Sequence, residues 1–76
     1  MTEQRTIEPA EMKVFLENQY LFPPEQLLPY AGQYIAWNLE GTAVVASSTD
    51  GLALHYRILE LGLDPSRTVI DYIDPL

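Results

Sequence analysis

Apolar residues recur at helical spacing near the N-terminus of the chain. Met12, Phe15 and Leu16 form a stripe along a helix that the pattern predicts from Pro9 to about Tyr20. A proline suits the first position of a helix, where the missing N–H would have no partner. A pair of prolines then ends this helix, and a short helical turn follows. The apolar stripe has to be covered, either by the rest of the domain or by another chain.

In the middle of the chain, the apolar residues no longer recur at helical spacing but at every second position. Residues 33–38 are rich in aromatic and β-branched types and predict a strand, with Ile35 and Trp37 on one of its faces. Gly41 lies in the loop that follows and suits a positive φ. Residues 43–47 provide the antiparallel partner, so this part of the chain predicts a hairpin.

A second helix follows a cluster of capping residues. The run from Ser47 to Asp50 places the helix start at Thr49 or Asp50, and Gly62 suits a left-handed cap at its end. Residues 68–73 alternate as a final strand. The apolar residues of the helix that lie on or near one face are Leu52, Tyr56, Leu59 and Leu63.

These elements predict an α+β fold in a single small domain, residues 1–76. Residues 1–29 supply the N-terminal helix and the proline-rich corner, and residues 30–76 supply a β-β-α-β core. A helical crossover makes the third strand parallel to the second, so we expect the strand order 2-1-3 in a mainly antiparallel sheet with one packed helix. The other face of the sheet is then open to the N-terminal helix or to a second copy of the chain.

Charge and composition narrow the function classes. Eleven acidic and four basic residues give a net charge of -7, which disfavours direct binding of nucleic acid. No stretch is apolar and long enough to cross a bilayer, and Met1 to Arg5 lack the apolar core of a signal peptide. We therefore expect a soluble, cytoplasmic protein. The absence of cysteine excludes disulfides, thiolate metal sites and cysteine nucleophiles.

The candidates for chemistry have structural explanations. His55 is the only histidine, and no motif places a serine or an acid to orient it. Asp50 and the hydroxyl residues before it are accounted for as helix-capping residues, and the glycines are isolated instead of forming a phosphate loop. We therefore expect no enzyme activity, no cofactor and no metal site. A hydrolase built from a dimer would have to depend on His55 or Asp50.

Aromatic residues are numerous for so small a body, and tyrosine and tryptophan are enriched at protein interfaces. The leading hypothesis is a non-enzymatic interaction or accessory module that binds another protein or a second copy of itself. The alternative is an acidic regulatory partner, similar to an antitoxin or inhibitor, that masks a basic protein surface. The candidate contact residues are Met12, Phe15, Leu16, Tyr34, Trp37 and Tyr72.

Four segments between residues 28 and 74 carry a resemblance. They are Tyr-Ala-Gly-Gln-Tyr-Ile-Ala-Trp at 30–37, Val-Val-Ala-Ser at 44–47, Leu-Gly-Leu-Asp-Pro at 61–65 and Val-Ile-Asp-Tyr-Ile at 69–73. The chain resembles a small prokaryotic family of unknown function with the pattern Y-x-G-K-Y-V-A, V-V-A-S-G, G-x-D-P and V-x-I. Gln33 replaces the usual lysine, and Ser48 stands where glycine is common. The resemblance implies the β-β-α-β fold and brings no established activity or catalytic residues.

Overall fold

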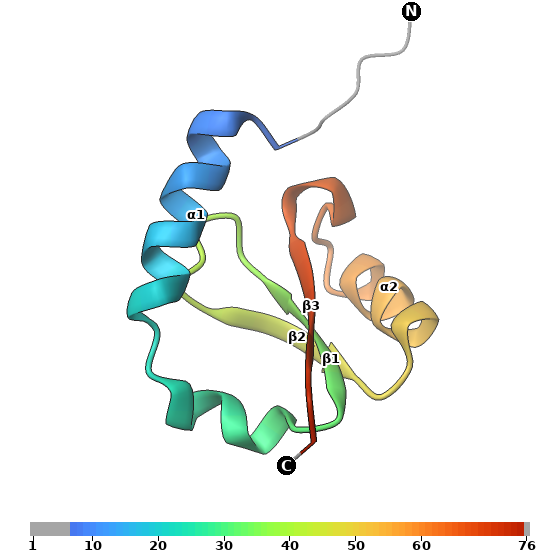
Figure 1. Cartoon of the computed structure of the whole chain (residues 1–76). Coiled ribbons are helices and arrows are strands. Elements are labelled where there is room, and N and C mark those ends of the chain that lie inside the picture. Colours follow the sequence, from blue (N-terminus) through green and yellow to red (C-terminus); the bar gives the residue numbers. More distant parts are fainter. Residues whose placement is uncertain (1–6, 76) are drawn as a thin grey trace, which may run out of the picture.

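The computed structural model describes residues 7–75, so the N-terminal segment considered above for a signal peptide lies outside the described residues. In this range α1 (Pro9–Leu21) leads into the 3-10 helix η1 (Pro24–Tyr30), followed by β1 (Gln33–Trp37) and β2 (Val44–Ser48). Next come α2 (Gly51–Glu60), the 3-10 turn η2 (Pro65–Arg67) and β3 (Val69–Ile73) (Figure 1). The α+β fold that the sequence predicts is confirmed. The ends of the two α-helices and the three strands lie within one or two residues of the prediction, and η2 was not predicted.

The sheet has the strand order β2-β1-β3, as expected. Both neighbours of β1 run antiparallel to it, with Ala36 opposite Ala46 in β2 and opposite Ile70 in β3. The register of the β1–β2 pair shifts between Ala36 and Trp37, so that Trp37 pairs with Val44. Because side chains alternate along a strand, the sheet presents two different faces to the two helices.

One face of the sheet is covered by α1 and η1 within the same chain (Figure 1). Phe15 packs here with Ile35 and Trp37, and the ring of Trp37 lies edge-to-face with those of Phe15 and Phe22 at centroid distances of 6.0 and 4.9 Å. The partly buried side chains packed against this cluster are Met12, Phe22, Leu27, Tyr30, Val44, Val69 and Ile73. The N-terminal helix therefore covers the sheet in cis.

The loop between β1 and β2 docks onto α1. Asn38 holds the loop closed, since its side-chain oxygen accepts hydrogen bonds from the backbone N–H groups of Thr42 and Ala43. Asn18 on α1 donates a hydrogen bond to the carbonyl oxygen of Glu40 at 2.8 Å. Gly41 has φ +76° and lies against the backbone of Phe15. The positive φ that the sequence predicts for this glycine is confirmed.

The other face of the sheet is packed by α2. Leu54 and Ile58 are buried against Ala36 and Ala46, and these small alanines let the helix approach the strands closely. Asp50 caps the helix, its carboxylate accepting from the N–H of Ala53 at 3.1 Å. Gly62 ends the helix at φ +76°, where the left-handed cap was expected. The helix packs over β2 and β1, so this layer covers the sheet incompletely.

Candidate functional site

The six candidate contact residues fall into two groups. Phe15 and Trp37 are 2% and 0% exposed, and Met12 packs against the same core cluster. These side chains stabilise the contact between α1 and the sheet, so a partner could not reach Phe15 or Trp37 without opening the core. We therefore remove these three residues from the candidate surface. Leu16, Tyr34 and Tyr72 are exposed and remain candidates.

Tyr34 and Tyr72 lie together on the sheet face that α2 occupies. They are direct partners in the β1–β3 pairing, and their rings pack at a centroid distance of 4.9 Å with an angle of 54°. Ile70 lies two residues from Tyr72 on the same face and is half exposed. Because α2 packs over β2 and β1, these three side chains remain exposed among residues 7–75. We call Tyr34, Ile70 and Tyr72 the open face.

The outward side of α2 is apolar as well. Leu52, Tyr56 and Leu59 recur at a spacing of four and three residues, which places them on one side of a helix. That side points away from the sheet, since Leu54 and Ile58 form the buried side. We call Leu52, Tyr56 and Leu59 the outer stripe. Leu63 lies beyond the end of α2, so it does not continue the stripe.

The sequence grouped Leu52, Tyr56, Leu59 and Leu63 on or near one face. The structure leaves all four exposed, and Leu54 and Ile58 form the buried side. What the pattern could not indicate is which side of α2 meets the sheet. Leu54 and Ile58 are also four residues apart, so the helix carries two apolar sides. Ile70 was not among the candidates; its position two residues before Tyr72 on the same face of β3 was the available signal.

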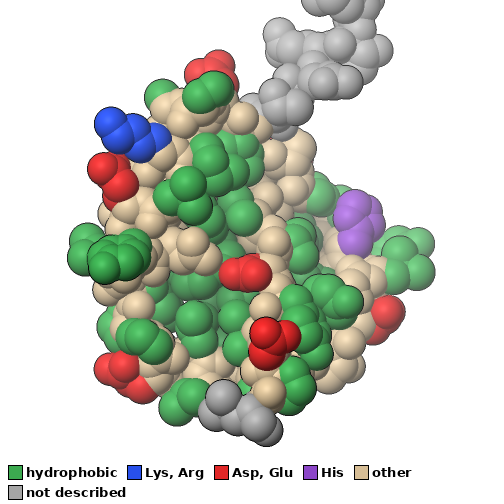
Figure 2. Space-filling model, viewed as in Figure 1, with side chains coloured by type: hydrophobic (Ala, Val, Ile, Leu, Met, Phe, Trp, Pro, Cys, Tyr) green, Lys and Arg blue, Asp and Glu red, His purple; other side chains and the backbone are tan. Residues whose placement is uncertain are grey.

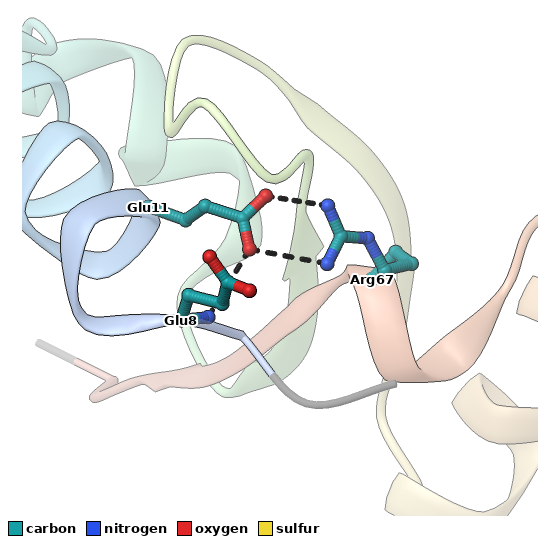
Figure 3. Close-up of polar contacts among 3 residues, drawn as sticks. All are labelled: Glu8, Glu11 and Arg67. Atoms are coloured by element: carbon teal, nitrogen blue, oxygen red, sulfur yellow. Dashed lines mark hydrogen bonds and ion pairs between the residues drawn. The ribbon is translucent and has the colours of Figure 1, made fainter. Parts of the chain in front are cut away.

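A charged pair ties α1 to the segment before β3. The guanidinium of Arg67 donates to both carboxylate oxygens of Glu11, at 3.1 and 2.5 Å (Figure 3). The carboxylate also accepts from the backbone N–H of Glu8 at 3.1 Å. These hydrogen bonds, first that of Arg67 and then that of Glu8, lower the pKa of Glu11, and the pKa of Arg67 is raised by the same pairing. This pair fixes the start of α1 and shows no feature of a reactive site.

The residues weighed for catalysis are not brought together. His55 is exposed on α2, and the centroid of its ring lies 5.9 Å from that of the Tyr56 ring. Asp50 serves as the helix cap. Within residues 7–75, no three histidine or acidic side chains are grouped so as to hold a metal ion. In the same range, no helix has the length and apolar character needed to cross a membrane.

Two shallow depressions lie elsewhere on the surface. The larger, of about 300 Å³, lies beside α1 and is lined by Ala10, Glu11, Val14, Leu39 and Glu40. This volume is at the lower end of the range for small-molecule sites, and its titratable groups are two carboxylates, one of which is paired with Arg67. The smaller, of about 240 Å³, is lined by Phe22, Gln26, Tyr30, Thr42, Ala43 and Val44. Neither combines a nucleophile with a base.

Comparison with known proteins gives no relative. No protein-family model, no curated protein and no solved structure matches the chain. Exposed apolar side chains lie on the outer stripe, on the open face, and on α1 and η1, where Leu16 remains a candidate.

Proposed function

We propose that the protein is a non-enzymatic interaction module and that it binds other protein chains through the side of the sheet that carries α2. The observation that supports this most is the apolar character of α2 on both of its sides. Apolar residues on two opposite sides of a helix are normally buried on both sides. Here the inner side is buried by the sheet, and the outer stripe has no cover within residues 7–75.

The amount of exposed apolar surface supports the same proposal. The six residues of the outer stripe and the open face together expose about as much area as three fully exposed side chains. At roughly 200 Å² for each large side chain, this is on the order of 600 Å². The largest apolar patch of a typical monomer is about 300–600 Å², and patches of this size are often functional. A standard interface buries roughly 800 Å² on each partner.

The proposal is tested by a surface scan with association as the measurement. Leu52→Ser, Tyr56→Ser and Tyr72→Ser change the proposed side, and Leu28→Ser changes an exposed leucine on η1 as the control. Binding to copies of the chain and to proteins cross-linked to it in its source cells is quantified for each variant. We expect the first three substitutions to weaken association and the control to leave it unchanged. Association that survives all three would overturn the proposal.

The acidic composition favours a second candidate, a regulatory partner that masks a basic protein surface. The net charge of -7 would then dominate recognition, so binding should weaken steeply as salt rises. Binding through apolar surfaces changes little over the same range. Titration of a bound partner at low and high salt separates the two candidates.

A further inference from the structure

The α2 side of the molecule has the shape of a step. The helix packs over β2 and β1 and forms the raised part, whose outward surface is the outer stripe. Beside it Ile70 and Tyr72 of β3 are exposed, and together with Tyr34 they form the lower part. In Figure 2 hydrophobic side chains are visible over α2 and beside β3, and also over α1 and η1. A helix is about 10 Å across and strands are about 4.8 Å apart. One helix therefore covers about two strands, and the third strand leaves room for the side of a second helix.

We infer that the occupant of the step is a second copy of this chain, an inference that rests on the proposed function. In a twofold arrangement, α2 of each copy lies over the open face of the other. The outer stripe then packs on Tyr34, Ile70 and Tyr72 of the second copy, and the same contact is made in the reverse direction. Such an isologous contact requires both halves of the interface on every chain, and this chain carries both.

This arrangement explains why α2 carries apolar residues on two opposite sides. Each α2 would lie between two sheets, with Leu54 and Ile58 on its own sheet and the outer stripe on the sheet of the second copy. All six exposed residues of the step would be buried by a single contact. A partner that bound only the outer stripe would leave the open face exposed, and the reverse would hold for a partner of the open face.

The distribution of charge favours a second copy over a basic partner. Residues 51–63 contain one arginine and one glutamate, so this segment is neutral while the whole chain carries -7. The acid of β3, Asp71, is turned to the opposite face of the sheet, where its carboxylate accepts from Gln19 of α1 at 3.4 Å. Asp50 and Asp64 flank residues 51–63 and Asp74 follows β3, so the middle of the contact is neutral and its acids lie at the ends of the two elements.

The test uses three substitutions that change the charge equally at positions of matched exposure. Leu59→Glu lies in the outer stripe at 49% exposure, Ile70→Glu in the open face at 50%, and Val14→Glu on α1, remote from the step, at 47%. Molar mass is measured by light scattering over a concentration series of the full chain. We expect a dimer for the unmodified protein and for Val14→Glu, and an increase in the dissociation constant of roughly 30-fold or more for each of the other two.

Circular dichroism of each variant shows whether it is folded, and the milder Leu59→Gln and Ile70→Thr replace any variant that is not. Weakening by Leu59→Glu alone would overturn the interlocked arrangement, because two outer stripes packed on each other would not involve Ile70. An unmodified chain that stays monomeric at every concentration would overturn the inference. The proposed function would then be tested by the surface scan, with binding to other proteins as the measurement. A dimer unaffected by both substitutions would also overturn it.

Discussion

At the scale of single residues, Gly41 shows how the loop between β1 and β2 determines the position of α1. Its φ is +76°, and a Cβ at this position would lie 2.6 Å from the carbonyl oxygen of Phe15. Gly62 has the same φ of +76°, but no heavy atom lies within 4 Å of its Cβ position. A side chain at Gly62 would meet backbone strain alone, whereas a side chain at Gly41 would meet the same strain and a steric overlap with Phe15.

Alanine at these glycines should have unequal effects on stability. Gly62→Ala costs about 1–2 kcal/mol of unfolding free energy through the left-handed backbone alone. Gly41→Ala adds roughly 1–3 kcal/mol because α1 or the loop has to move. Urea unfolding followed by circular dichroism measures both values. Equal losses would contradict the close packing of Phe15 on the loop.

Glu11 makes the stability depend on pH. Its pKa is lowered in the folded protein from the ordinary value of 4.5, through its hydrogen bonds with Arg67 and Glu8. The stabilisation is therefore fully present above the unfolded pKa and is lost as the pH falls through the lower folded pKa. We expect Glu11→Gln to flatten the dependence of the urea midpoint on pH below about 5. Glu25→Gln, an exposed acid on η1, is the control, and an identical flattening in both variants would contradict this role.

At the scale of elements, much of the architecture could be predicted from local sequence signals. The proline at the start of α1 and the proline pair after it act within a few residues, as do the capping aspartate of α2 and the glycine at its end. The bounds of both helices therefore followed from these signals. The rotation of α2 about its own axis depends on distant residues. Ala36 and Ala46 create the space for Leu54 and Ile58, and no pattern within residues 51–60 contains that information.

The two sides of α2 should respond differently to the same substitution. Leu54 is 0% and Leu52 63% exposed. Leu54→Ala should cost about 2–5 kcal/mol of unfolding free energy, the usual range for a buried leucine. Leu52→Ala should change it by no more than about 0.5 kcal/mol in protein dilute enough to be monomeric. A larger loss for Leu52→Ala under these conditions would mean that α2 is rotated from the orientation described.

At the scale of the whole molecule, the sequence predicted an uncovered sheet face and left open what covers it. The contact of α1 and η1 with the sheet answers this for one face, because Phe15 and Trp37 lie at its centre. Arg67 could not be anticipated as the partner of Glu11, since the two residues are 56 positions apart and meet only after the sheet has formed. The step between α2 and β3 likewise exists only in the assembled fold.

Self-association through this step links stability to concentration. A ligand or partner that binds only the folded state raises the unfolding midpoint by mass action, and a second copy does the same. The thermal midpoint of the unmodified protein should therefore rise over about a hundredfold increase in concentration. Leu59→Glu should remove the rise. A constant midpoint in the unmodified protein would contradict the dimer independently of light scattering.

The position of Trp37 gives the chain a built-in optical reporter. It is the sole tryptophan, it is fully buried, and it lies between α1 and the sheet, on the opposite side from the outer stripe and the open face. Its indole emission therefore responds when the core opens and is insensitive to events at the step. Three of the five tyrosines, Tyr34, Tyr56 and Tyr72, lie at the step, so tyrosine signals respond to association as well as to unfolding. Selective excitation of Trp37 in an unlabelled sample therefore reports folding without a contribution from association.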